Sequence, residues 1–100
     1  MNIVALIHKE NDVYGISFPD LPGCISAADS RDELLTNAQE ALSLHLWGMA
    51  DDGETIPPLR SEAELRSDPE FREDFADATE VTLVDLPEPA EPDTIVRAAE

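Results

Sequence analysis

The chain has 100 residues, enough for one small domain with a single modest core. Its 23 acidic and 6 basic side chains give a net charge of −17, which disfavours direct binding to nucleic acid or to anionic membranes and favours a basic protein partner. The single cysteine, Cys24, excludes an intramolecular disulfide, and no segment resembles a transmembrane helix or a signal peptide, so we expect a cytoplasmic protein. The alternative is that the negative net charge has no specific partner and only keeps the protein soluble.

The charge is concentrated in the second half of the chain. Residues 1–50 contain seven acidic and two basic side chains, whereas residues 51–100 contain sixteen and four. We therefore expect the second half to form the electrostatic face of the molecule.

The first part of the chain predicts three strands. Residues 2–8 are apolar at both alternating sets of positions, which indicates an interior strand that is covered on both faces. A polar turn at residues 9–12 leads to a second strand at residues 13–18, and this short connection predicts an antiparallel hairpin. Residues 24–28 are a weaker third strand.

The connection between the second and third strands has the sequence Phe-Pro-Asp-Leu-Pro-Gly-Cys. Pro22 and Gly23 suit a type II turn, because proline fixes the first central φ and glycine supplies the positive φ of the second. Cys24 is expected to be a small buried apolar group, since the two histidines, His8 and His45, show no recognisable triad spacing to it.

A long amphipathic helix follows. Ser30 is its expected N-cap, with Glu33 completing a capping box, and the sequence Asp-Asp-Gly at residues 51–53 marks its end. One apolar stripe at helical spacing should pack on one face of the sheet. It consists of Leu34, Leu35, Ala38, Ala41, Leu42, His45, Leu46 and Met49.

The second half predicts short helices, then a strand. Residues 51–60 are a loop stiffened by two prolines, and a second capping box begins a short helix at residues 61–67. Asp68 and Pro69 can begin another helical turn, with Phe71 and Phe75 as its apolar anchors.

Residues 80–86 alternate like a fourth strand, residues 87–93 are an acidic, proline-rich linker, and residues 95–97 could extend a strand. The order β-β-β-α-β predicts an α+β fold, mostly antiparallel, with one helix packed on one face of the sheet. A right-handed crossover would place the fourth strand beside the first and parallel to it.

Three carboxylates are candidates for a metal site of the kind that RNase H-like nucleases use, namely Asp20, Asp29 and Glu40. The strand centres are apolar, however, and Asp20 and Asp29 lie in connections between elements. We therefore expect these acids to be solvated turn and cap residues. Neither a metal nor a cofactor is expected, and a metal-dependent nuclease is a poor interpretation of this chain.

This order of elements resembles the HicB antitoxin family over residues 3–60. The residues that carry the resemblance are Phe18, Pro19, Asp20, Leu21, Pro22, Gly23 and Cys24, together with Glu40, Ala41 and Leu42 in the helix. Pro57 and Pro58 follow, where the family often has alternating prolines. We treat the motif residues as structural.

The resemblance implies a degenerate, partial RNase H-like domain without nuclease activity. It also implies a partner, the toxin HicA, which is a small, basic, RNA-cleaving protein whose active site the antitoxin covers. We expect the toxin to contact residues 51–80. The candidate electrostatic partners there are Asp51, Asp52, Glu54, Glu62, Glu64 and Asp68.

Two further expectations concern assembly. The apolar residues on both faces of the first strand, and the open edges of a small sheet, favour a homodimer or higher oligomer. An alternative function is therefore a stand-alone, HicB-like oligomer with a regulatory or scaffolding role and no toxin.

Many members of the family continue past a Val-Arg strand into a DNA-binding module, whereas here Val96-Arg97 is followed by three residues. We therefore divide the chain into a HicB-like domain at residues 1–86 and an acidic, proline-rich tail at residues 87–100. Either this member lacks the DNA-binding module or the chain has been shortened, and in both cases we expect that this chain does not bind nucleic acid by itself.

Overall fold

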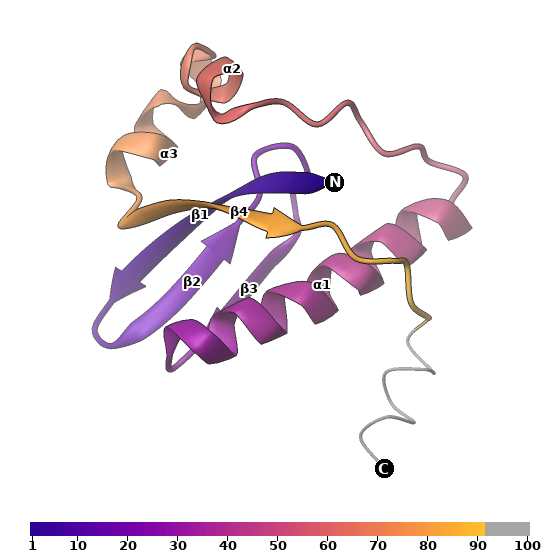
Figure 1. Ribbon diagram of the computed structural model, residues 1–100, viewed down its shortest axis with the longest axis horizontal. Coiled ribbons are helices and arrows are strands. Elements are labelled where there is room, and N and C mark those ends of the chain that lie inside the picture. The colour runs from indigo at the N-terminus through magenta and orange to yellow at the C-terminus, as the bar shows by residue number, and fades with distance from the viewer. Residues whose placement is uncertain (92–100) are drawn as a thin grey trace.

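The computed structural model describes residues 1–91, and its centre is a four-stranded antiparallel sheet (Figure 1). The strands are β1 (Asn2–Glu10), β2 (Val13–Ser17), β3 (Ile25–Ala28) and β4 (Glu80–Asp85), and their spatial order is β3-β2-β1-β4. All four expected strands are present, with ends shifted by two residues or fewer. The α+β fold and the interior position of the first strand are therefore confirmed.

One face of the sheet is covered by the long helix α1 (Arg31–Asp51). The Ser30 hydroxyl accepts a hydrogen bond from the Glu33 amide at 3.2 Å, as expected of the N-cap, and Gly53 follows the helix end with a φ of +76°. The expected capping box is incomplete, because the Glu33 side chain makes no return hydrogen bond to the Ser30 amide within the described residues. The stripe residues that are fully buried against the sheet are Leu34, Ala38, Leu42 and Leu46.

The opposite face of the sheet is covered near one end by three short elements: α2 (Glu62–Arg66), the 3-10 turn η1 (Pro69–Phe71) and α3 (Arg72–Asp77). The capping box that begins α2 is complete, with Ser61 and Glu64 each bonded to the other's backbone amide. Leu65 and Phe75 from these elements pack on the sheet in a second buried cluster.

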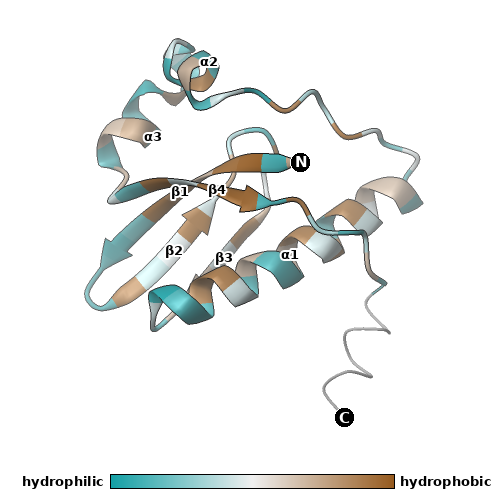
Figure 2. Ribbon diagram, viewed as in Figure 1, coloured by the Kyte–Doolittle hydropathy of each residue, from teal (hydrophilic) through white to brown (hydrophobic). Residues whose placement is uncertain are grey.

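Strand β1 is the common wall of both cores. Its side chains Ile3, Ala5 and Ile7 belong to the core under α1, whereas Val4 and Leu6 belong to the core under α2 and α3. The strand is correspondingly apolar over most of its length (Figure 2). This confirms that the strand with two apolar faces is covered on both sides.

The expectation of a parallel fourth strand is wrong, because β4 pairs with β1 antiparallel, with Ile3 opposite Val84 and Ile7 opposite Glu80. A single helical crossover would have returned the chain parallel to β1. Here residues 53–77 cross back over the second face after α1, so β4 enters the sheet from the opposite end (Figure 1).

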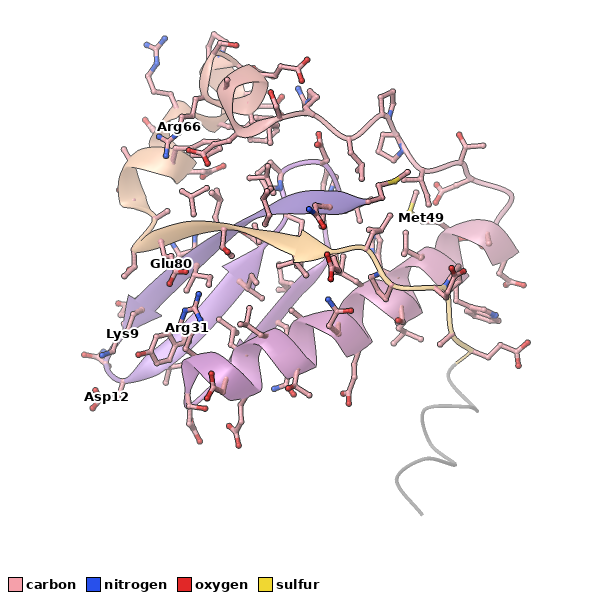
Figure 3. All side chains as sticks on the ribbon, in the orientation of Figure 1. Lys9, Asp12, Arg31, Met49, Arg66 and Glu80 are labelled. Carbon is pink, nitrogen blue, oxygen red and sulfur yellow. The ribbon has the colours of Figure 1, made fainter. Side chains whose placement is uncertain are left out.

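Helix α1 is also held by the C-terminal part of the described chain, at its first residue and again within its second half. The guanidinium of Arg31 points toward the carboxylate of Glu80 in β4, with Nε 2.9 Å from Oε1 (Figure 3). The amide of Ala90 donates to the carbonyl of Ser43 at 3.1 Å, so the start of the proline-rich linker lies against the helix. The expected strand at residues 95–97 lies outside the described residues. Among residues 1–91, no helix combines the length and the apolar character that crossing a bilayer requires.

The second core gives a test of this architecture. Leu65 is fully buried and fixes α2 to the sheet. Leu65→Ala should lower the free energy of unfolding by about 2–4 kcal/mol, because the cavity would form where only short helices cover the sheet. Leu44→Ala on α1, where Leu44 is 41% exposed, should cost less than about 1 kcal/mol. Urea unfolding followed by circular dichroism measures both, and equal losses would contradict the second core.

Candidate protein interface

The connection between β2 and β3 forms a tight turn at one end of the sheet. The amide of Leu21 donates to the carbonyl of Phe18 at 3.0 Å, and the amide of Cys24 donates to the carbonyl of Leu21 at 3.1 Å. Gly23 has a φ of +91°, which is the positive φ expected for the second central position of a type II turn. Pro22 and Gly23 are exposed at the tip, while the residues on either side are buried.

Asp20 is a buried residue of this turn, and its side chain is only 2% exposed. One carboxylate oxygen, Oδ2, accepts the backbone amide of Arg60 at 2.7 Å, and the other, Oδ1, accepts Nε of the same arginine at 2.8 Å. The expectation that Asp20 is a solvated turn acid is therefore wrong. Its burial is tolerated because both oxygens are hydrogen-bonded and its charge is paired.

The three candidate metal ligands do not come together. Asp20 is committed to Arg60, whereas Asp29 and Glu40 are exposed on other parts of the molecule. Within residues 1–91, no group of three or more histidine, cysteine, aspartate or glutamate side chains is arranged to hold a metal ion.

Arg60 extends the contact from the turn to the short helices. Its Nη1 donates to Oδ2 of Asp68 at 3.1 Å, and Oδ1 of Asp68 accepts the amide of Glu70, which caps η1. The guanidinium carbon also lies 5.3 Å from the ring centroid of Phe71. The hydrogen bond with Asp20, followed by the charges of Asp20 and Asp68, raises the pKa of Arg60 above its ordinary value. One arginine thus joins the β2–β3 turn, the extended segment and η1.

Cys24 lies in the same turn and is buried in the core. Desolvation raises the pKa of its thiol to about 11, so the thiol is protonated at neutral pH. The residue fills space at the start of β3, as expected from the sequence.

The six acids expected to contact a basic partner fall into two groups, at opposite ends of the extended segment 53–61 (Figure 1). One group lies at the end of α1 and the other at α2 and η1. The first group comprises Asp51, Asp52 and Glu54, and the second comprises Glu62, Glu64 and Asp68.

The two groups differ in how they are used within the chain. Glu62 pairs with Arg66 at 2.7 Å, and Asp68 pairs with Arg60. Glu64 accepts the Ser61 amide at 2.9 Å, and this hydrogen bond lowers the pKa of its carboxyl. Asp51, Asp52 and Glu54 are exposed and form no ion pair with any described residue. The first group is therefore more available to a partner than the second.

A further set of acids was missed from the sequence. It lines η1 and α3 and consists of exposed side chains at helical spacing: Glu70, Glu73, Asp74 and Asp77. The spacing of three, four and seven residues was the available signal, because Phe71, Phe75 and Ala78 form the complementary apolar stripe. Residues 51–77 thus contain ten acidic and three basic side chains, a net charge of −7.

The sequence and the structure were compared with known proteins. The family model described as "HicB_like antitoxin of bacterial toxin-antitoxin system" matches residues 3–95. An uncharacterized 14.9 kDa protein from the rep-hol intergenic region of Haemophilus phage HP1 is 39% identical over 80 residues, which are 80% of this chain and 60% of the phage protein. The chain therefore spans less than two thirds of the length of that relative.

Two solved structures have a similar fold. The N-terminal domain of the Burkholderia pseudomallei antitoxin HicB is 30% identical with a TM-score of 0.68, and the match covers 85% of this chain and 96% of that domain. A chain of the HicA3 and HicB3 toxin–antitoxin complex is 24% identical with a TM-score of 0.69, and the match covers 89% and 100%. At that identity, the second likeness concerns the fold alone.

The Asp20–Arg60 contact predicts a clear effect of removing one charge. Asp20→Asn keeps the size of the side chain but loses one acceptor and the negative charge, so the free energy of unfolding should fall by about 1.5–3 kcal/mol. Asp29→Asn, in an exposed turn, should change it by less than about 0.5 kcal/mol. Urea unfolding at pH 7 compares the two variants, and equal effects would contradict a structural role for the buried pair.

The thiol gives a second test. With a pKa of about 11 for Cys24, about one thiol in a thousand is ionised at pH 8, so iodoacetamide should label the folded protein slowly. In 8 M urea the pKa should return to about 8.5, and labelling should become at least about 100-fold faster. Mass spectrometry follows the reaction, and rapid labelling of the folded chain would contradict the burial of Cys24.

Proposed function

The chain belongs to the HicB-like antitoxins of bacterial toxin–antitoxin systems, and from that membership we propose that it neutralises a small, basic, RNA-cleaving toxin of the HicA type. In this proposal residues 1–86 form the toxin-binding domain, and the antitoxin acts by covering the active site of the toxin. An RNA-cleaving target places the pair in the cytoplasm.

The observation that carries the proposal is the charge of the segment over the second face of the sheet. Residues 51–77 have a net charge of −7, and the carboxylates of Asp51, Asp52, Glu54 and the stripe on α3 are exposed. A toxin that cleaves RNA must present cationic groups to phosphates, so a rigid acidic surface can occupy the same groups and exclude the substrate.

The states of the buried acid and of the cysteine agree with a role that needs no catalysis. Its buried acid is neutralised by Arg60, its cysteine is held in the protonated form, and its family consists of antitoxins. The family description names a bacterial toxin-antitoxin system, which supports a toxin as the class of partner.

The alternative is a stand-alone oligomer without a toxin. It is favoured by β4, an edge strand on which Leu83 is 60% exposed, since such an edge can pair with a second copy. Light scattering of the purified chain, together with the identity of the neighbouring gene, separates the two functions.

Binding to the neighbouring gene product tests the proposal. Co-expressed with the small basic protein that the proposal expects to be encoded beside it, the chain should co-purify with that protein and abolish its cleavage of RNA in stoichiometric amounts. A neighbour that does not co-purify, or that cleaves RNA equally well in the presence of excess antitoxin, would contradict the proposed function.

The contribution of the exposed acids at the end of α1 to toxin binding can be tested separately. Neutralising the first acidic group (Asp51→Asn, Asp52→Asn and Glu54→Gln together) should slow association at low salt by about threefold to tenfold, since charges at the edge of an interface act on the association rate. The matched control changes three exposed acids at the other end of the sheet, Glu10→Gln, Asp12→Asn and Asp29→Asn, and Asp12 marks that end in Figure 3. Stopped-flow kinetics at two salt concentrations compare them, and equal slowing by both sets would assign the effect to net charge alone.

A further inference from the structure

The start of edge strand β3 presents an apolar side chain that the fold leaves uncovered. Ile25 is the first residue of the strand and is 70% exposed, the highest value among the large apolar residues after Met1. Within residues 1–91 the strand has no neighbour on its outer side, because the order of the sheet ends with β3. An exposed isoleucine at a sheet edge leaves apolar surface in water, and such surface is typical of a site that a partner covers.

Ile25 lines two hollows of the surface. The first has a volume of about 220 Å³ and lies between the β2–β3 turn and η1–α3, with Phe18, Pro22 and Phe71 in its wall. A larger hollow of about 420 Å³ adjoins it, because Pro19, Pro22, Glu70 and Phe71 line both, and the two together are called the groove below. The other hollow beside Ile25, of about 230 Å³, lies toward α1 and includes Leu44, which is 41% exposed.

The groove has an apolar wall and an acidic margin. Glu70 lines both of its parts, Asp74 lines the smaller one, and both residues are exposed. Neither carboxylate forms an ion pair with any residue between 1 and 91. Arg60 lines the larger hollow, but its charge is already shared by Asp20 and Asp68.

The arrangement matches a cationic protein side chain. The stem of an arginine or lysine can lie on Phe71 and Pro22 while its charged head meets Glu70 and Asp74. Ile25, standing beside the groove, can enter an apolar pocket of the same partner. Apolar anchors next to desolvated charge pairs are the usual centre of a strong protein interface.

The charges also argue against two other occupants. A second copy of this chain would bring few cations, because three of the four arginines within residues 1–91, namely Arg31, Arg60 and Arg66, are already in ion pairs. A nucleic acid would bring phosphates to Glu70 and Asp74 and be repelled.

We infer that the basic partner docks on the groove between the β2–β3 turn and η1–α3, with Ile25 as the apolar anchor and Glu70 and Asp74 as acceptors for its cationic side chains. This inference rests on the proposed function, and it moves the centre of the interface away from the acids at the end of α1.

The test uses the full chain and the small basic protein encoded beside it. Ile25→Ala should raise the Kd about tenfold or more, mainly through faster dissociation, because it removes the apolar anchor. Glu70→Gln combined with Asp74→Asn should raise the Kd about tenfold and reduce its salt dependence. Surface plasmon resonance measures the rates, and thermal unfolding checks that each variant is folded.

Matched controls change residues that do not line the groove. Leu83→Ala removes a side chain of similar exposure on β4, and Glu10→Gln with Asp12→Asn removes two exposed acids at the hairpin. Both controls should bind within about twofold of the unmodified chain.

The outcomes separate the inference from the function on which it rests. If the unmodified chain does not bind the basic protein, the proposed function fails together with the inference. If it binds, but Ile25→Ala and the Glu70/Asp74 variant remain within twofold, the function stands and the groove is overturned. A loss of binding in Leu83→Ala alone would likewise overturn it, in favour of the β4 edge.

Discussion

Strand β1 places the central constraint on this fold, because it is apolar on both faces and cannot be left open to water on either. Helix α1 covers one face, and only the chain that follows it remains to cover the other. That face is buried by residues 53–77, which cross the sheet between the end of α1 and the start of β4. Because of this crossing, β4 begins at the opposite end of the sheet and pairs antiparallel with β1. The hydrophobic requirement of one strand thus sets the direction of another, nearly eighty residues away.

The return segment is short of apolar anchors, and a charged contact completes its attachment. Leu65 and Phe75 are the buried side chains that it contributes to the second core, and Arg60 ties it to the β2–β3 turn through Asp20. A single buried carboxylate would be unstable here, but two hydrogen bonds and one cation compensate it. The same arginine holds Asp68, which in turn caps η1, so hydrogen bonds connect the turn to the short helices.

This use of the basic residues has an electrostatic consequence. Arginines that pair within the chain neutralise Asp20, Glu62, Asp68 and Glu80, and the other carboxylates of residues 1–91 are exposed and form no ion pair there. An antitoxin that works by occupying a cationic site needs such a surplus of accessible negative charge on a rigid support. In the proposed complex, Glu70 and Asp74 stand beside an apolar groove, where a partner would exclude water and strengthen each contact. The acids at the end of α1 would remain in solvent and act on the rate of encounter.

The sequence by itself determined the local structure: the strands from their alternation, the helix from its cap and stripe, and the β2–β3 turn from Pro22 and Gly23. The ordered motif from Phe18 to Cys24 was also sufficient for the family, which the matching family model confirms. These features depend on residues within a few positions of one another, so they can be read along the chain. Only the tertiary structure decided the direction of β4, the burial of Asp20 and the division between engaged and free acids. The first two depend on contacts between distant residues, as with Asp20 and Arg60, which are forty positions apart. A carboxylate in a turn has the same local sequence whether it faces water or an arginine, and only the folded chain brings that arginine to it.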